Sequence, residues 1–284
     1  MRIAKGHGTE NDFVVLFDPA REVDLTPDLV RALCDRRAGL GADGVLRVVL
    51  AAADPEGAAM SDRARWFMDY RNADGSVAET CGNGLRVFAR YLVDAYLAPV
   101  GRWEVATRAG LTGVRLGAVG DVTVEMGRAS FPAGPGVTVT AAGRTWSATP
   151  VHLPNPHAVA FVDDLAEAGD LGTAPEVRPG GAFPQGVNVE FVARQGPTRL
   201  ALRVWERGVG ETRSCGTGVC AAAAAAARDA GLAGPVTFEV QVPGGRLEVG
   251  LAADGALELT GPAVLVADGE VRPGWLADHR RRQG

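Results

Sequence analysis

Two cysteines in this chain are each followed by Gly-x-Gly, and each motif runs into a helix-like stretch. The first motif is ETCGNGLRVF (79–88), with Cys81, and the second is RSCGTGVCAA (213–222), with Cys215. The start of a helix has free N–H groups and a partial positive charge, and glycines let the backbone approach a ligand closely. Such a site binds a carboxylate and favours a thiolate, which lowers the pKa of the cysteine below its free value of about 8.5. Each motif therefore predicts an anion-binding turn beside a reactive sulfur.

A pair of such thiols suits the removal of a proton from an α-carbon and its return on the opposite face. One group must be a thiolate and the other a thiol in each ground state, while the helix ends stabilise the charge that develops on the carboxylate. The pair predicts a two-base epimerase or racemase. Cys34 and Cys220 lack the flanking glycines and are predicted to fill the core. A metal site of Cys215, Cys220 and His157 is disfavoured, because Cys-x4-Cys is not the usual zinc spacing.

The elements that must position these motifs are mostly strands. Helical spacing predicts three helices, at Asp28–Cys34, Leu85–Leu97 and the alanine-rich Val219–Ala230, of which the last is a buried central helix. Both halves of the chain contain strands, then the motif, one helix and more strands, which predicts a duplicated α/β unit linked through GRASFPAGPG (127–136). Short runs of Val, Leu or aromatic residues bounded by Gly, Pro or Asp predict the strands Ile3–Ala4, Phe13–Asp18, Val45–Ala51, Arg65–Asp69, Trp103–Thr107, Thr112–Leu116, Asp121–Met126, His157–Val162, Val187–Ala193, Leu200–Trp205, Val236–Val242, Arg246–Leu251 and Ala256–Thr260.

The composition excludes several classes of partner. The apolar fraction of 46% and the charged fraction of 22% are those of a soluble globular protein. A net charge of −5 gives no support to a nucleic-acid or anionic-membrane partner. The start, MRIAKGHGTENDF, lacks the apolar region of a signal peptide, and no run of about 18 apolar residues exists, so we expect a cytoplasmic protein.

Cofactors are not expected either. Pyridoxal phosphate is bound to a lysine in many amino-acid racemases, but Lys5 is the single lysine of this chain. The chain has no GxGxxG after a strand and no GxxxxGK[ST], so nucleotide binding has no support. We expect chemistry without a cofactor and without a metal.

Taken together, six segments resemble the diaminopimelate epimerase family over nearly the whole chain. The resemblance implies the cofactor-independent interconversion of LL- and meso-2,6-diaminopimelate, for lysine and peptidoglycan biosynthesis in bacteria. It also implies an α/β (α+β) fold of two pseudo-symmetric domains, each a curved mixed β-sheet around a central helix, with the active site in the cleft between them. We expect domains at 1–130, joined by the tail 266–284, and at 131–265. The segments are GHGTENDFVV (6–15), GLGADGVL (39–46), NADGSVAETCGNGLR (72–86), NPHAV (155–159), GVNVEF (186–191) and WERGVGETRSCGTG (205–218).

The resemblance also implies roles for individual residues, with the acid/base pair being Cys81 and Cys215. The reacting carboxylate would be held by the backbone N–H groups of Gly82, Asn83, Gly216 and Thr217. The substrate's amino and carboxylate groups would be bound by Asn11, Asn72, Asn155, Asn188, Glu206 and Arg207. Two further side chains would lie close to the thiols and set their protonation, His157 and Glu206. Taken alone, each has a simpler structural interpretation: turn asparagines satisfy the backbone, Glu206–Arg207 forms a surface ion pair and His157 lies in the core.

The chain departs from the family pattern at three places. Thr9 and Glu10 stand where an apolar residue and a glycine are common, Gly44 where some members have a substrate-contacting glutamine, and Ser214 where alanine is usual. None of these changes removes a thiol. Because of them, the sequence does not determine the conformation of the first loop, the substrate contact at position 44 or the surroundings of Cys215.

Three rival functions remain at this point. A racemase for another amino acid on the same fold would keep both cysteines but change the residues that grip the distal amino acid, Asn72, Asn188 and Arg207. A phenazine-biosynthesis-type isomerase of similar fold would use a carboxylate base in place of the cysteines. A binding or structural protein with inert thiols would not exchange the substrate's α-hydrogen with solvent. The sequence leaves the oligomeric state open, a homodimer included.

Overall fold

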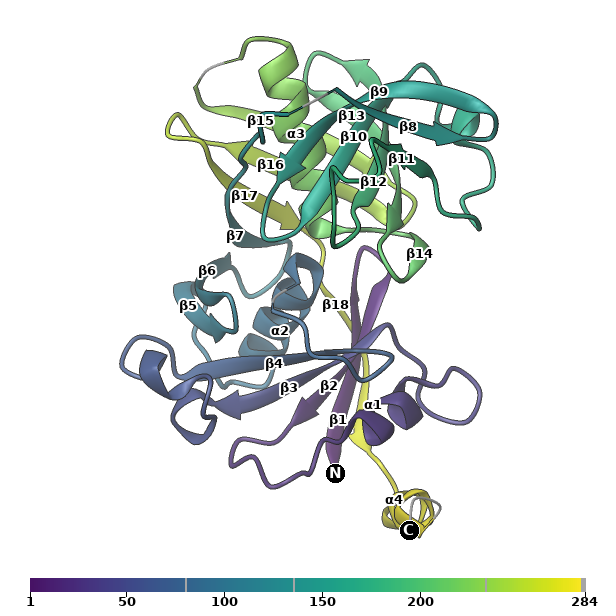
Figure 1. The fold of residues 1–284 in the computed structure, drawn as a ribbon. Coiled ribbons are helices and arrows are strands. Elements are labelled where there is room, and N and C mark those ends of the chain that lie inside the picture. Colours follow the sequence, from purple (N-terminus) through teal and green to yellow (C-terminus); the bar gives the residue numbers. More distant parts are fainter. Residues whose placement is uncertain (80, 135, 233, 282–284) are drawn as a thin grey trace. The chain divides into compact units, whose positions relative to one another are not determined.

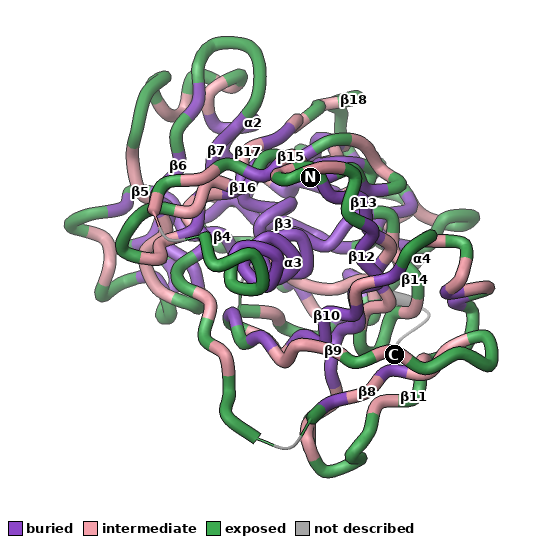
Figure 2. The backbone as a smooth tube through the Cα atoms, turned by 90° about the horizontal axis from the view of Figure 1, so that it is seen from above, coloured by how far each residue is buried: buried purple, intermediate pink, exposed green. Residues whose placement is uncertain are grey.

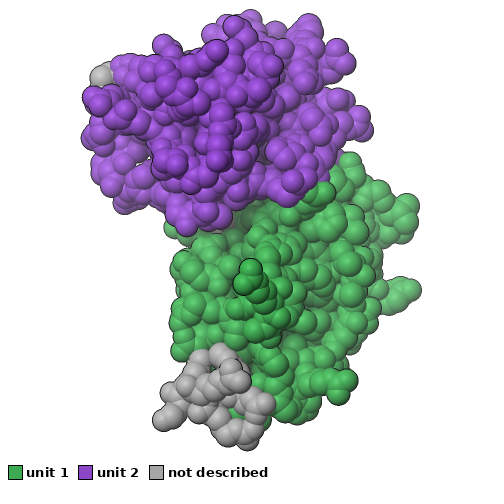
Figure 3. All heavy atoms as spheres, turned by 90° about the vertical axis from the view of Figure 1, so that its right-hand side faces the viewer, with its two compact units in different colours: residues 1–124, 262–284 green, residues 125–261 purple. Residues whose placement is uncertain are grey.

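Both ends of the chain belong to the same structural unit. Unit 1 comprises Met1–Val124 and Pro262–Gly284, and unit 2 comprises Glu125–Gly261 (Figures 1 and 3). The computed structural model describes residues 1–79, 81–134, 136–232 and 234–281. Among these residues, no helix combines the length and the apolar character that a membrane span requires.

The strands of unit 1 pair in the order β18-β1-β2-β3-β4-β5-β6-β7, of which β7 continues beyond Val124 into unit 2. The pairs β2–β3 and β4–β5 are parallel, and the other described pairs of this series are antiparallel. The strands are β1 (Arg2–Gly8), β2 (Asn11–Phe17), β3 (Gly44–Leu50), β4 (Trp66–Asn72), β5 (Gly101–Thr107), β6 (Gly110–Leu116), β7 (Val122–Arg128) and β18 (Val264–Glu270). The helices are α1 (Pro27–Cys34), α2 (Gly82–Asp94) and α4 (Pro273–Arg281), with the short turns η1 (Ala51–Ala53) and η2 (Ala58–Met60).

Unit 2 repeats this topology. Its strands follow the order β8-β9-β10-β12-β13-β15-β16-β17, with parallel pairs at β10–β12 and β13–β15 and antiparallel pairs elsewhere in the series. The duplication predicted from the two cysteine motifs is therefore confirmed at the level of strand order and direction. The strands are β8 (Val137–Ala141), β9 (Arg144–His152), β10 (Pro156–Val162), β11 (Glu176–Arg178), β12 (Asn188–Gly196), β13 (Arg199–Glu206), β14 (Gly210–Thr212), β15 (Val236–Val242), β16 (Gly245–Leu251) and β17 (Ala256–Gly261), beside α3 (Gly216–Asp229) and η3 (Leu165–Ala168).

In each unit the sheet curves around one central helix. Helix α2 contacts β1, β2, β3, β4, β6 and β18, and α3 contacts β9, β10, β12, β13, β15, β16 and β17. Figure 2 shows α3 in the colour of buried residues. The alanines Ala221–Ala227 are each at most 5% exposed, because small side chains let strands approach the helix from all sides. The predicted mixed α/β fold with a buried, alanine-rich central helix is confirmed.

Two sequence predictions need correction. The first long helix begins at Gly82 and not at Leu85, and it ends at Asp94 and not at Leu97. Glycine and asparagine are weak helix formers, so propensity alone hides the first turn of α2. The predicted linker 127–136 is not wholly irregular, because β7 runs to Arg128 and Ser130 exchanges backbone hydrogen bonds with His152. Residue 135 of that segment lies outside the described residues.

Candidate active site

Cys81 occupies the residue immediately before the first turn of α2. Its backbone is extended, with φ −148° and ψ 118°, and its sulfur accepts a hydrogen bond from the Gly84 N–H at 3.4 Å. Its S–H group points to Asn11 Oδ1 at 3.8 Å, and the Asn83 side-chain amide donates to the same oxygen at 3.2 Å. The structure therefore brings together three predicted site residues of unit 1, namely Asn11, Cys81 and Asn83.

The orientation of Asn11 is fixed by a residue that the sequence analysis did not single out. The Asn11 amide nitrogen donates to Asp43 Oδ2 at 2.8 Å, so its oxygen faces Cys81. Asp43 is itself held by Arg36, whose Nη2 donates to Asp43 Oδ1 at 2.7 Å. Asp43 lies in GLGADGVL (39–46), and its position within a segment of the family pattern was the available signal.

Asn72 lies at the end of β4. It is in register with Gly44 of β3, and its side-chain amide donates to Ser76 Oγ at 2.9 Å. A Cβ at position 44 would lie 2.5 Å from the Arg71 carbonyl oxygen and 2.8 Å from Tyr70 Cε2. The glutamine that some family members carry at this position could not be accommodated here without a shift of the backbone.

In the turn between β1 and β2, the Thr-Glu departure from the family pattern has a visible consequence. Thr9 and Glu10 both have a left-handed backbone, with φ 50° and 62°. Two such residues in succession match the tight turn that joins antiparallel strands, and glycine or asparagine normally fills it. The Glu10 N–H donates to His7 Nδ1 at 3.2 Å. The turn therefore keeps the hairpin geometry with side chains that strain it.

Cys215 begins α3 in the same way as Cys81 begins α2, with φ −122° and ψ 113°. It is more buried, at 6% exposure, and its sulfur lies 3.4 Å from Thr217 Oγ1. The neighbouring Ser214 is also buried. Glu206, at the end of β13, accepts a hydrogen bond from the Thr212 hydroxyl and another from Cys215. The thiol of unit 2 thus lies directly beside a carboxyl group.

Burial raises the pKa of the Cys215 thiol well above its ordinary value, and the charges of Glu206 and Glu190 raise it further. Hydrogen bonds from Thr217 and the Gly218 N–H oppose this shift but do not outweigh it. The expectation of a lowered pKa at this helix start is therefore wrong for Cys215, because burial and two carboxylates exceed the effect of the helix end. Burial also raises the pKa of Glu206, against hydrogen bonds from Thr212 and Cys215.

His157 forms a buried pair with Glu190, a residue that the sequence analysis did not single out. The distance from His157 Nδ1 to Glu190 Oε1 is 2.6 Å, and both side chains have 0% exposure. The second ring nitrogen of His157 lies 2.9 Å from Asn155 Oδ1. The signal in the sequence was an acidic residue inside the apolar strand GVNVEF (186–191).

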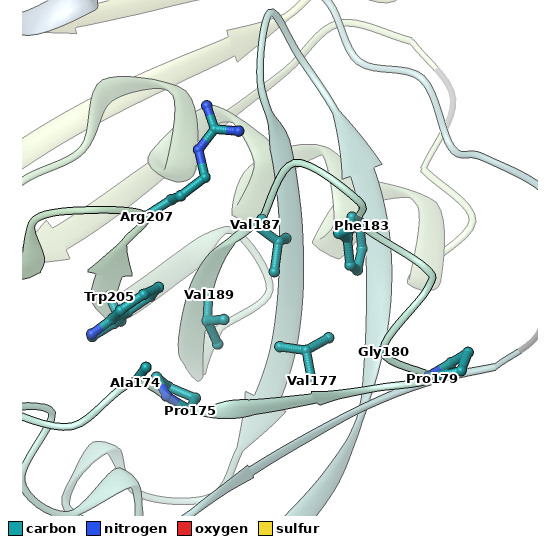
Figure 4. A pocket seen from close by; sticks show the side chains of 11 residues that line it. Ala174, Pro175, Val177, Pro179, Gly180, Phe183, Val187, Val189, Trp205 and Arg207 are labelled. Atoms are coloured by element: carbon teal, nitrogen blue, oxygen red, sulfur yellow. The ribbon is translucent and has the colours of Figure 1, made fainter. Parts of the chain in front are cut away.

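Asn188 and Arg207 form a third group in unit 2. Asn188 Oδ1 accepts a hydrogen bond from the Arg207 backbone N–H at 2.9 Å, and Arg207 Nη1 donates to the Gln185 carbonyl at 2.6 Å. Arg207 stands at the rim of a pocket of about 220 Å³ whose apolar wall includes Val189 and Trp205 (Figure 4). Neither cysteine of the two motifs lines this pocket. Figure 4 shows the guanidinium of Arg207 directed away from the valines.

The other two cysteines are buried, as predicted. Cys220 lies in α3 with no exposed surface, and Cys34 lies at the end of α1 in a cluster of apolar side chains. Burial raises the pKa of Cys34 to about 12. Among the residues that the structure describes, no group of three His, Cys, Asp or Glu side chains is arranged to hold a metal ion.

Solved structures share this architecture at low sequence identity. A phenazine biosynthesis protein of the PhzF family from Bacillus anthracis matches with a TM-score of 0.71 and 15% identity, over 96% of this chain and 99% of that one. A probable proline racemase from Agrobacterium radiobacter, with bound carbonate, matches with a TM-score of 0.69 and 17% identity, over 96% and 93% of the two chains. The fold is thus shared with a phenazine biosynthesis protein, a probable proline racemase and a hydroxyproline epimerase.

Sequence comparison narrows this class to one family. The diaminopimelate epimerase family profile matches residues 3–132 and 150–266. The diaminopimelate epimerase of Streptomyces coelicolor is 58% identical, over 96% of each chain, and that of Thermobifida fusca is 52% identical, over 96% of this chain and 98% of its own. This chain belongs to the diaminopimelate epimerase family.

Proposed function

We propose that this chain epimerises diaminopimelate with its two motif cysteines. The activity itself, an isomerase reaction in lysine biosynthesis, follows from full-length similarity to diaminopimelate epimerases. In the proposed mechanism the thiolate of one cysteine takes the α-proton of the substrate. The thiol of the other delivers a proton to the opposite face of the same carbon, so the S–H bond that forms is balanced by the S–H bond that breaks.

One observation carries this proposal: the same folded unit occurs twice, each time with a cysteine at the start of its buried central helix. In each unit the first turn contributes N–H groups that have no partner within the helix. We propose that those of Gly82, Asn83, Gly216 and Thr217 hold the reacting carboxylate and stabilise the charge that develops on it.

We propose that the two thiols differ in protonation state, as the mechanism requires. The raised pKa of Cys215 keeps it a thiol at neutral pH, which makes it the proton donor in the resting enzyme. Cys81 is less buried and receives the Gly84 N–H on its sulfur. We propose it as the thiolate, which forms when Cys81 gives up the proton that now points to Asn11 Oδ1. His157 and Glu206 would set the proton balance on the side of Cys215.

The remaining predicted residues would bind the substrate's polar groups. We propose that Asn11 and Asn155 bind near the reacting carbon, since each lies beside a catalytic group. Asn72, Asn188 and Arg207 would bind the distal amino acid. Arg207 has five N–H donors on its guanidinium, of which Nη1 contacts Gln185, and the fork can pair with a carboxylate.

The environment of the single lysine supports a mechanism without pyridoxal phosphate. Lys5 Nζ lies 2.6 Å from Asp12 Oδ2 and also donates to the Gly41 carbonyl. An ammonium group held by a carboxylate is not a free nucleophile for a Schiff base. We therefore propose that no cofactor takes part.

The test uses Cys81→Ala and Cys215→Ala with LL- and meso-diaminopimelate in D₂O, without added cofactor. We expect each variant to lose epimerisation by at least about 100-fold, since each lacks one acid/base group. Each should still exchange deuterium slowly into one isomer with retention, and the two variants should prefer opposite isomers. Near-wild-type epimerisation by either variant, or the same preferred isomer for both, would sink the two-thiol mechanism.

A further inference from the structure

The buried pair of His157 and Glu190 is an unusual feature of the unit 2 core. Glu190 Oε1 contacts His157 Nδ1, whereas Glu190 Oε2 has no hydrogen-bond partner among the described residues. Removing one carboxylate oxygen from water without a partner is costly, and buried ion pairs contribute little to stability. The pair is therefore not explained by what it adds to folding.

The duplicated unit shows what the fold itself needs at this place. In unit 1, Phe13 of β2 is in register with Gly44 of β3, and in unit 2, His157 of β10 is in register with Asn188 of β12. Two residues further along β3 and β12 lie Leu46 and Glu190. The buried Phe13 and Leu46 of unit 1 therefore correspond to His157 and Glu190 of unit 2.

The contacts under the two central helices confirm this correspondence. A Cβ at Gly84 of α2 would lie 3.1 Å from Leu46 Cδ2 and 3.6 Å from Phe13 Cζ. A Cβ at Gly218 of α3 would lie 2.7 Å from Glu190 Oε1. The last glycine of each Cys-Gly-x-Gly motif thus rests on hydrocarbon in unit 1 and on a carboxylate in unit 2. The same backbone accepts an apolar pair, so the charged pair of unit 2 serves another purpose.

We propose that Glu190 is a positioning residue of the epimerisation, which holds His157 by its Nδ1–H and places a negative charge under the first turn of α3. The inference rests on the proposed two-thiol mechanism. A carboxylate oxygen and an amide oxygen both accept hydrogen bonds, so both ring nitrogens of His157 face acceptors. Nδ1 faces Glu190 Oε1, and Nε2 faces Oδ1 of Asn155, a residue proposed to bind the substrate.

The charge of Glu190 also acts on the thiol of unit 2. The groups that act on Cys215 are Glu206 from β13, Glu190 from β12 and Thr217 and the Gly218 N–H from α3 itself. His157 from β10 contacts Glu190 and acts on Glu206. Both carboxylates raise the pKa of Cys215, in the same direction as burial. The two carboxylates thereby favour the protonated form of Cys215, the form that the thiol of a thiol and thiolate pair requires.

Glu190→Gln removes the charge but keeps the volume and an oxygen that can accept from His157 Nδ1. We expect kcat to fall about ten- to hundredfold, as for other groups that orient a working histidine, with a smaller change in KM. The alkaline limb of the kcat/KM profile, where the second thiol proton is lost, should move about one unit to lower pH in both reaction directions.

Asp18→Asn serves as the matched control. Asp18 is a buried carboxylate paired with Arg47 in unit 1, with side-chain exposures of 5% and 3%. This variant should lose stability and keep the wild-type pH profile. If Glu190→Gln likewise loses stability but keeps the wild-type kcat and pH profile, Glu190 is merely structural and the proposal is overturned.

Two further measurements apply even if Glu190→Gln does not fold. The double variant His157→Phe/Glu190→Leu copies the apolar pair of unit 1; it should fold and lose turnover, and wild-type turnover would overturn the proposal. In the wild-type protein, labelled with ¹⁵N-histidine, we expect a slowly exchanging proton on His157 Nδ1 at neutral pH, and an unprotonated Nδ1 would also overturn it. Absence of epimerisation by the wild-type chain would instead remove the proposed function itself.

Discussion

At the scale of single residues, the chemistry of unit 2 is governed by carboxyl groups beside a buried sulfur. Glu206 shares a hydrogen bond with Cys215, and its charge raises the pKa of that thiol. Glu206→Gln should therefore lower the pKa of Cys215 and increase the fraction of thiolate at a given pH. Alkylation of Cys215, followed by mass spectrometry between about pH 7 and 9, should become faster by about tenfold for each unit by which the pKa falls.

The control for this prediction is Glu211→Gln. Glu211 lies on the neighbouring strand β14, where it pairs with Arg203 at 2.7 Å, and it is not one of the carboxylates that raise the pKa of Cys215. Its loss should leave the alkylation rate of Cys215 unchanged. A Glu206→Gln protein with unchanged or slower alkylation of Cys215 would show that the carboxyl group does not hold the proton on this sulfur.

The two Cys-Gly-x-Gly motifs indicated both cysteines, and the family resemblance indicated several of the side chains found beside them, but neither indicated the asymmetry of the candidate site. Cys81, Asn11 and Asn83 come together, as do Cys215, Glu206 and Thr217. Glu190 and Asp43 escaped the analysis because their importance depends on partners that only the pairing of strands brings close. The raised pKa of Cys215 escaped it for the same reason, since a helix start is visible in the sequence whereas depth of burial is not.

At the scale of secondary structure, the central helix α3 depends on the small size of its side chains. Ala222 has 0% exposure, and strands contact the helix on several sides. Ala222→Leu should destabilise the fold by about 1–3 kcal/mol, because a close-packed core has no room for the added carbons. Ala230→Leu, at the exposed end of the same helix, should change stability little. Urea unfolding of both variants tests this, and equal stabilities would contradict close packing around α3.

The strands that the sequence failed to predict share a physical feature. Each carries only a weak apolar signal. β8 alternates Val and Thr over just five residues, β9 mixes polar and apolar residues, and most residues of β18 are exposed. They are strands because a neighbour pairs with them: β18 with β1, and β8 with β9. Apolar strands such as β3 and β12 were predicted to within a few residues, because both of their faces are buried.

At the scale of the whole molecule, a charged cluster ties distant segments of unit 1 together. Asp12 lies 2.6 Å from Lys5 Nζ and 2.7 Å from Arg36 Nη2. Burial alone would raise the pKa of Asp12, but hydrogen bonds and charge from Arg36 and Lys5 outweigh it and lower the value from 3.8 to about 2. A carboxyl group whose pKa is lower in the folded state than in the unfolded chain stabilises the fold at every pH above its unfolded-state pKa. This contribution is lost as the pH falls from about 4 to about 2.

Asp12→Asn should therefore remove part of the acid sensitivity of the fold. The stability difference between wild type and variant, measured by urea unfolding, should be smallest near pH 2 and grow until about pH 5, above which it should be constant. The control is Asp121→Asn, which changes an exposed carboxylate. The stability of this variant should depend on pH in the same way as that of the wild type. A difference between wild type and Asp12→Asn that does not vary across this pH range would contradict the lowered pKa.

The return of the chain to unit 1 makes the folding of that unit depend on the last residues. β18 pairs with β1 from Arg2↔Glu270 to His7↔Val264, and the Pro262 carbonyl accepts from Arg86 of α2. A chain that ends at Gly261 loses this whole ladder. At about 1 kcal/mol net for each hydrogen bond, the loss is a large share of the 5–15 kcal/mol that stabilises a domain. Backbone amides of β1 and α2 should then exchange much faster in hydrogen–deuterium exchange, while those of α3 and β12 in unit 2 stay protected.

A chain that ends at Arg272 is the matched control, because it keeps β18 and removes α4. It loses the contact of Trp275 with the Ala38 carbonyl, at 3.3 Å, but keeps the hydrogen bond from the Val271 N–H to the Met1 carbonyl. Protection of β1 should therefore persist in this shorter chain. If the chain ending at Gly261 keeps β1 protected as well, unit 1 does not need its returning strand. If α3 loses protection together with β1, the two units unfold as one, and the stability of unit 2 cannot be assigned to its own core.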